Sequence, residues 1–182
     1  MIDVMIDIET FGTGIYPVIA SIGAVRFDLD TGEMGEEFYT NIDVDSQVKA
    51  GFVMEGATVE WWMKQSDEAR KALFEPEPLH TLKALELFAK YLREVNKTCV
   101  WGNGSNFDNR IVRNAYNKLS MTAPWHYRDD RDVRTLVALG RSMGVNTKSE
   151  QIFEGTAHNA LDDARNQVKY CVHTWKQIRE RS

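Results

Sequence analysis

The chain has 182 residues, of which 43% are hydrophobic and 27% are charged, and its net charge is −5 at pH 7. This length predicts one domain over residues 1–182 with a core of its own. The acidic balance argues against tight, nonspecific binding of a duplex through a basic surface. No apolar run approaches the ~20 residues of a membrane span, and no basic segment precedes the apolar N-terminus, so we expect a soluble, cytoplasmic protein.

The first part of the chain predicts three strands in succession. Residues 2–8 are apolar and β-branched, residues 18–29 are largely apolar, and residues 35–43 follow an Asp-Thr-Gly turn. Gly12 and Gly14 are expected to end the first strand. Consecutive strands with short connections favour an antiparallel meander.

The rest of the chain predicts helices around one short buried strand at residues 98–101, which ends at Gly102. Apolar residues at helical spacing, together with capping residues such as Asp132, indicate the helices. The predicted helices span residues 58–74 (as two short helices broken near Ser66), 79–95, 107–119, 133–143 and 160–180. A leading meander followed by helices and a further strand predicts an α/β fold, with a mixed sheet flanked by α-helices.

Asp7 and Glu9 end the first strand, next to a glycine-rich turn. Side chains two apart on a strand point to the same face, so both carboxylates are expected side by side. Carboxylate oxygens are the ligands that Mg²⁺ prefers. Roughly one Asp-x-Glu pair is expected by chance in a chain with this many acids, so the pair alone is a weak signal.

Two further places offer metal ligands. Asp108 follows the short buried strand, and His158 precedes Asp163 by five residues at the start of the last helix. Roughly 0.3 such His-Asp pairs are expected by chance. Both acids also fit the simpler interpretation of acids at helix N-termini, favoured by the helix dipole. Asp162 is the rival of Asp163 for the ligand role, and helical periodicity does not decide between them.

Gathered at one point, these four carboxylates and one imidazole would hold two divalent metal ions and activate a water molecule. Such an arrangement is suited to hydrolysis of a phosphodiester bond.

The order Asp-x-Glu, Asn-Phe-Asp and His-x-Ala-x-Asp-Asp-Ala resembles the three motifs of DEDDh 3′→5′ exonucleases, over residues 4–170. A sister subgroup has tyrosine four residues before the last acid, where this chain has Asn159. The segments ATVEWWMKQSDEAR and RDVRTL further resemble a branch of phage exonuclease A-like proteins and mycobacterial exoribonucleases. The resemblance implies a ribonuclease H-like sheet, in which parallel strands join the antiparallel meander.

The resemblance also implies roles for the five residues. Asp7, Glu9 and Asp163 would hold one Mg²⁺ or Mn²⁺ ion, and Asp7 and Asp108 a second. His158 would act as the general base that takes a proton from the attacking water. The expected substrate is single-stranded RNA or DNA with a free 3′ end, and the product a nucleoside 5′-monophosphate. Many relatives are homodimers, so a homodimer is one prediction.

Substrate contacts are expected from six further residues. Thr10, Phe11 and Gly12 form the turn that in this family contacts the terminal sugar or base, and Asn106 belongs to the second motif. Trp61 and Trp62 are adjacent on a predicted helix, about 100° apart, so both cannot be central on one narrow buried face. One of them is a candidate for base stacking or for a subunit interface.

Two other functions compete with the exonuclease. A ribonuclease H-like endonuclease is disfavoured by the order of the motifs. A non-catalytic module that binds nucleic acid or a partner predicts the loss of a ligand residue, and all five are present. The basic residues Arg110, Arg113, Arg128, Arg131, Arg134, Arg165 and Lys169 are interpreted as solvated helix faces.

Overall fold

A computed structural model describes residues 2–95, 98–145 and 153–181. The elements in chain order are β1 (Ile2–Thr10), β2 (Ile19–Phe27), β3 (Met34–Asn41), α1 (Val44–Lys49), α2 (Gly56–Met63), α3 (Asp67–Ala72), α4 (Thr81–Arg93), β4 (Thr98–Gly102), α5 (Asp108–Lys118), a 3-10 helix (Tyr127–Asp129), β5 (Asp130–Asp132), α6 (Val133–Ser142) and α7 (Ala160–Glu180). Among these helices, none combines the length and the apolar character needed to span a bilayer.

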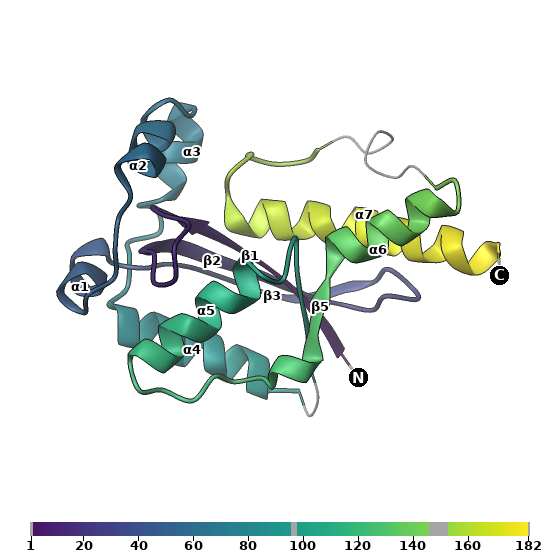
Figure 1. Ribbon diagram of the computed structural model, residues 1–182, viewed down its shortest axis with the longest axis horizontal. Helices are drawn as coiled ribbons and strands as arrows, with labels where there is room; N and C mark the ends of the chain where they lie inside the picture. Colours follow the sequence, from purple (N-terminus) through teal and green to yellow (C-terminus); the bar gives the residue numbers. More distant parts are fainter. Residues whose placement is uncertain (1, 96–97, 146–152, 182) are drawn as a thin grey trace.

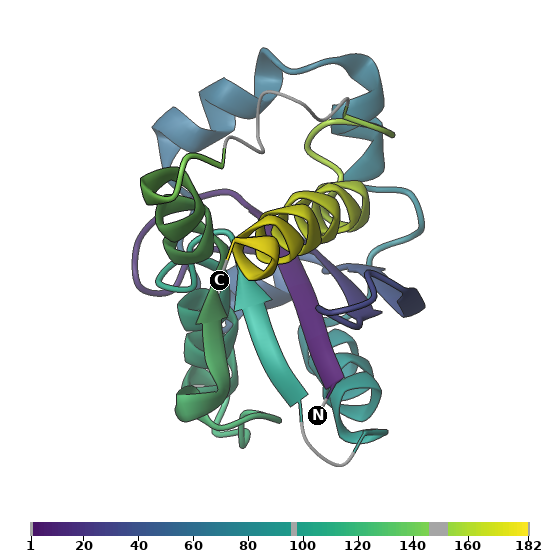
Figure 2. The same ribbon diagram turned by 90° about the vertical axis from the view of Figure 1, so that its right-hand side faces the viewer.

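The strands form one mixed sheet in the order β3-β2-β1-β4-β5. β1 pairs antiparallel with β2 and β2 with β3, which confirms the predicted meander. β4 runs parallel to β1, and β5 runs parallel to β4. Figures 1 and 2 show α4 and α5 on one face of this sheet and α6 and α7 on the other, so β1 is a central strand covered on both sides.

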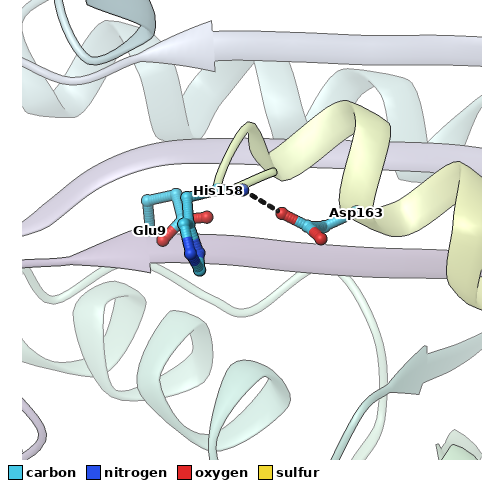
Figure 3. Close-up of side chains that lie close together, drawn as sticks. All are labelled: Glu9, His158 and Asp163. Atoms are coloured by element: carbon cyan, nitrogen blue, oxygen red, sulfur yellow. Dashed lines mark hydrogen bonds between the residues drawn. The ribbon is translucent and has the colours of Figure 1, made fainter. Parts of the chain in front are cut away.

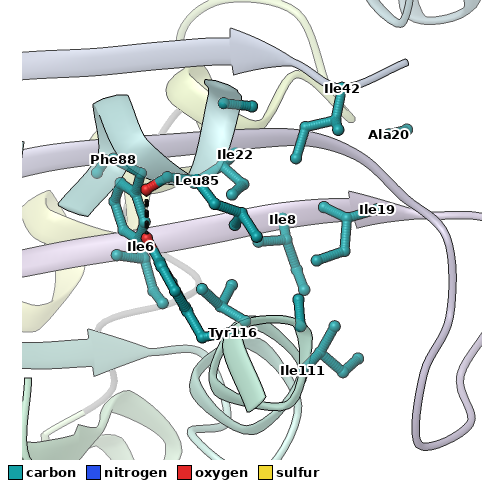
Figure 4. Packing of buried hydrophobic residues seen from close by; sticks show 14 of the residues in the cluster. Ile6, Ile8, Ile19, Ala20, Ile22, Ile42, Leu85, Phe88, Ile111 and Tyr116 are labelled. Carbon is teal, nitrogen blue, oxygen red and sulfur yellow. Dashed lines mark hydrogen bonds between the residues drawn. The ribbon is translucent and has the colours of Figure 1, made fainter. Parts of the chain in front are cut away.

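Alternate residues of β1 contribute to two different cores. Val4, Ile6 and Ile8 pack with apolar residues of α4 and α5 (Figure 4), where the Tyr116 hydroxyl donates a 2.7 Å hydrogen bond to the Leu85 carbonyl. Met5 faces the other side, in a core with Val133 of α6 and Val168 of α7. Because successive side chains of a strand point to opposite faces, Asp7 and Glu9 share the face of Met5, which is the face toward α7.

The predicted elements are all present, with ends that shift by a few residues. The break near Ser66 is confirmed, because the Ser66 hydroxyl accepts a hydrogen bond from Ala69 N and caps α3. Asp132 caps α6 in the same way, accepting from Thr135 N at 2.8 Å. The last helix has the predicted bounds.

Two elements go beyond the sequence prediction. α1 is a six-residue helix that depends on the Asp43 side chain, which accepts from Ser46 N. β5 has the sequence Asp-Arg-Asp and so lacks the apolar pattern of a strand. Its Asp130 is instead held by polar contacts from the Arg113 guanidinium and the Trp125 indole. Pairing with β4, rather than strand propensity, makes this segment extended.

Candidate active site

Asp7 and Glu9 lie on one face of β1, as their spacing predicts. This face is continuous with Met5, which contacts the core beneath α7. A register shift between Glu9 and Thr10 ends the regular pairing with β2. The two acids therefore stand at the carboxyl end of the central strand, where the chain turns away from the sheet.

Asp108 reaches the same edge of the sheet by a different route. It is the first residue of α5, after β4 has ended, and its side chain is buried. At Gly102 a Cβ would lie 3.2 Å from the Cβ of Asp108 and 2.4 Å from the Oδ1 of Asn109, so a glycine allows the helix to start this close to the strand. Because β1 and β4 are parallel, their carboxyl ends bring Asp108 to the acids of β1.

His158 and Asp163 come from the start of α7. The backbone N–H of His158 donates a 2.9 Å hydrogen bond to Oδ2 of Asp163 (Figure 3), and His158 adopts a left-handed backbone with φ of 65°. One ligand atom each from Glu9, His158 and Asp163 lie within 4.8 Å of one another. The loop before α7 thus folds back so that its histidine faces the acids of β1.

The structure distinguishes Asp163 from its rival Asp162. The carboxylate of Asp162 accepts a hydrogen bond from Thr156 N at 2.9 Å and pairs with Arg165 at 2.7 Å. Asp163 instead lines the pocket that contains Glu9. Adjacent residues on a helix are ~100° apart, so only one of the two can face this point.

All five predicted residues line one pocket, together with Ile8, Asn103, Phe107 and Gln167. Gln167 is four residues after Asp163 on α7, and its Nε2 donates a 2.6 Å hydrogen bond to Oδ1 of Asp7. Asn103 is half-buried, and its Oδ1 has no hydrogen-bond partner in the described part of the chain. No motif in the sequence indicated Asn103 or Gln167 as site residues. The i, i+4 spacing from Asp163 was the one available signal for Gln167.

The turn after Glu9 contains Thr10, Phe11 and Gly12, the first group of expected substrate contacts. The Thr10 hydroxyl donates to the Gly12 carbonyl at 2.7 Å, and Phe11 is buried. Glu55, just before α2, holds the far side of the turn by accepting from Gly14 N at 3.0 Å. The turn is therefore tied to α2 by direct contacts.

The other expected contacts differ in their exposure. Trp62 is 3% exposed, and its Nε1 donates a 2.9 Å hydrogen bond to the Thr10 carbonyl. Trp61 is 42% exposed, so the two tryptophans divide between a buried and an open position, as expected. Asn106 is exposed and is not among the residues that line the pocket, whereas Asn103 is.

Arg134 lies beside the loop that follows β4. Its Cζ is 3.5 Å from the position that a Cβ on Gly104 would occupy. No carboxylate in the described ranges pairs with Arg134, whereas Arg113 pairs with Asp130 and Arg165 pairs with Glu37. Among the described residues, Arg134 is thus an exposed cation without a carboxylate partner.

A family model described as the 3′-5′ exoribonuclease Rv2179c-like domain matches residues 2–175. The chain belongs to this family. The match covers every strand, the five predicted residues and most of α7.

Relatives and solved structures agree with the family assignment. An exodeoxyribonuclease of Enterobacteria phage T4 is 26% identical over 199 residues, covering 92% of this chain and 86% of the relative. An exonuclease I structure has a TM-score of 0.68 at 20% identity over 92% of this chain, which spans 39% of that protein. The nuclease domain of 3′hExo, a DEDDh family member bound to rAMP, has a TM-score of 0.66 at 13% identity, covering 96% and 92% of the two chains.

These similarities confirm the predicted resemblance to DEDDh exonucleases and the ribonuclease H-like α/β fold. They also support an exonuclease enzyme. The family model is named for RNA, whereas the T4 relative is named for DNA.

The carboxyl groups of this pocket are buried close together, and their pKa values are raised. Burial raises the pKa of Glu9 to about 8 and that of Asp108 to about 7. The pKa of Asp7 is raised well above its usual range by burial and then by the charges of Asp108 and Glu9, and burial also raises the pKa of Asp163. The charge of Arg134 lowers the pKa of Asp108, but burial has the larger effect.

Divalent cations fit this donor set. Several carboxylates converge in one pocket with too little positive charge among the described side chains to balance them. Mg²⁺ and Mn²⁺ take oxygen ligands of this kind, and bound cations are often the largest charges in such sites. Among the neighbours, E. coli exonuclease I has been solved with single-stranded DNA in a zinc-bound form.

Proposed function

We propose that this protein is a metal-dependent 3′→5′ exonuclease that shortens single-stranded RNA or DNA to nucleoside 5′-monophosphates. One observation carries the proposal. Asp7, Glu9, Asp108, Asp163 and His158, which come from three distant parts of the chain, line a single pocket in a member of an exoribonuclease domain family. Chance would not be expected to bring these five side chains together.

Two divalent ions are assigned to the four carboxylates. Glu9 and Asp163 would hold one ion with Asp7, and Asp7 and Asp108 would hold the other. When bound, such ions stabilise the charge that develops on the phosphate and lower the pKa of the attacking water. Gln167 fixes the orientation of Asp7 through its 2.6 Å hydrogen bond, as outer residues commonly do for ligating carboxylates.

His158 is assigned the role of general base. Its ring lies close to Glu9 and Asp163 (Figure 3), and His158 lines the pocket. Among the side chains, histidine in general has the reference pKa nearest to neutral pH, which suits removal of a proton from water. In this assignment an imidazole nitrogen accepts that proton as the water attacks the last phosphodiester.

Arg134 is assigned to the phosphate backbone of the substrate. Within the described residues it has no carboxylate partner, it lies beside Gly104, and its charge acts on Asp108. A guanidinium binds phosphate oxygens through its fork of N–H donors. Without such a cation, the acidic pocket and the net charge of −5 would oppose approach of a polyanion.

Single-stranded substrate is supported by the neighbours, because E. coli exonuclease I has been solved with dA16 and dT13 oligonucleotides. The free 3′ end and the predicted homodimer are part of the proposal. Sedimentation of the purified protein measures its oligomeric state directly.

The first experiment uses RNA and DNA of one sequence, each labelled at the 5′ end, with Mg²⁺ or Mn²⁺. The proposal expects a ladder that shortens from the 3′ end, disappears with EDTA and is lost in Asp7→Ala. A circular strand of the same sequence should survive. Cleavage of the circle would indicate an endonuclease, and binding without turnover of either strand would indicate a non-catalytic module.

A further inference from the structure

The imidazole of His158 lacks the usual means of orientation. Its backbone is fixed by the hydrogen bond to Asp163 and by the left-handed φ of 65°. In the described part of the chain, however, neither ring nitrogen of His158 has a hydrogen-bond partner. A catalytic histidine is commonly oriented by a hydrogen bond at the nitrogen that does not react. A contact of another kind would be needed to limit rotation of this ring.

The indole of Trp61 supplies such a contact. The ring centroids of Trp61 and His158 are 4.9 Å apart with an interplanar angle of 80°, and those of Trp62 and His158 are 6.1 Å apart at 82°. These are edge-to-face geometries, which aromatic pairs prefer over a face-to-face sandwich. Trp61 is the nearer of the two rings and the only one of this pair with substantial exposure.

The tryptophan pair is itself anchored to the strand that carries the acids. Trp62 packs edge-on against Trp61 at 5.1 Å and against Phe11 at 6.3 Å. Its Nε1 donates to the carbonyl of Thr10, the residue after Glu9. The two tryptophans that contact His158 are therefore fixed relative to the carboxylates, although they belong to a separate helix, α2.

We infer that Trp61 is a positioning residue that holds the His158 imidazole over the pocket. This inference rests on the proposed exonuclease function. It differs from base stacking, because the indole acts through the histidine and not on the substrate. A stacking residue mainly alters KM, whereas a residue that orients the general base mainly alters kcat.

The test is a double-mutant cycle on the labelled-strand assay. Trp61→Ala should lower kcat roughly threefold to tenfold, the range of one aromatic pair contact, with little change in KM. Trp61→Phe should recover most of the loss. In a His158→Ala background, the same Trp61→Ala change should have almost no further effect on the residual rate.

Two controls keep the inference falsifiable. Met63→Ala removes a 71% exposed side chain from the same helix and should leave kcat unchanged. Trp61→Leu keeps apolar bulk but has no ring, so it should show the same loss of kcat. It replaces Trp61→Ala in the cycle if the alanine variant folds poorly. Equal losses with and without His158, an unchanged kcat, or a loss confined to KM would each overturn the inference. A wild-type protein without turnover would instead reject the proposed function itself.

Discussion

The five predicted residues come from three parts of the chain, and local secondary structure sets the direction in which their side chains point. Asp7 and Glu9 share a face because strands alternate, whereas Asp163 faces the pocket and Asp162 faces Thr156 and Arg165, because α7 turns ~100° per residue. Asp108 is positioned by the end of β4 and the start of α5. The motif therefore depends on secondary structure for direction and on the sheet for proximity.

Loss of the general base should act on rate. His158→Ala is expected to lower kcat by about 10²–10⁴-fold, the usual contribution of general acid–base catalysis. Stabilisation of the fold by Mg²⁺ should largely persist, because the four carboxylates remain. Single-turnover rates and thermal unfolding with Mg²⁺ measure the two effects, and near-full activity would remove His158 from the assigned role.

Gln167 offers a test of how Asp7 is oriented. Gln167→Leu removes the donor to Asp7 Oδ1, so metal affinity or activity should fall about 10–100-fold, as is usual for residues behind a ligand. Titration of activity with Mg²⁺ measures the shift. Gln177→Leu, near the far end of α7 where Gln177 donates to Glu180, is the matched control and should leave the titration unchanged.

At the scale of elements, β2 and α7 must approach closely to form the pocket. Gly23 of β2 lies opposite Asp7, and a Cβ there would come within 2.3 Å of the backbone at Ala160 and Leu161. The first turn of α7 can thus lie this close to β2 only because residue 23 has no side chain. His158 and Asp163 flank that contact in the sequence.

Gly23→Ala should therefore damage both stability and the site. We expect a loss of about 1–3 kcal/mol in the free energy of unfolding, as for other overpacked cores, and a larger fractional loss of activity. Denaturant unfolding and the ladder assay measure both. Gly35→Ala in β3, where the nearest atom would be 3.7 Å away, is the control and should stay within about 0.5 kcal/mol. Similar behaviour of the two variants would contradict this account.

At the scale of the whole molecule, the buried acids couple stability to pH. The folded-state pKa values of Glu9 and Asp108, about 8 and about 7, lie above the unfolded values near ~4. Between these limits the folded state binds more protons than the unfolded state, so stability falls as pH rises.

The metal-free protein should consequently unfold at a higher temperature at pH 6 than at pH 9. Mg²⁺ should reduce the difference by stabilising the ionised carboxylates at pH 9. Thermal unfolding in EDTA and in Mg²⁺ at both pH values measures this. Asp108→Asn is the control, since it should unfold less readily than wild type at pH 9 in EDTA. Stability that rises with pH in EDTA would contradict the buried-acid account.

Charge at the rim should set the salt dependence of substrate binding. Arg134→Gln is expected to raise KM and to lower the slope of log affinity against log salt by ~0.7, the value for one lost phosphate contact on a single strand. Arg113→Gln is not a suitable control, because it would leave the half-buried Asp130 of β5 without its ion pair. Arg179→Gln, whose partner Asp30 is exposed and remote from the pocket residues in the sequence, should leave the slope unchanged.

The sequence by itself determined the meander and the amphipathic helices, which follow from local periodicity, whereas the five residues of the motif were indicated by its resemblance to the exonuclease motifs. It did not predict β5 or α1, whose stability comes from pairing with β4 and from the Asp43 cap. Only the tertiary structure separated Asp163 from Asp162, brought Gln167 to Asp7 and placed Trp61 against His158. Those relations join residues on different elements, so they depend on how the helices pack on the sheet, which local patterns do not encode.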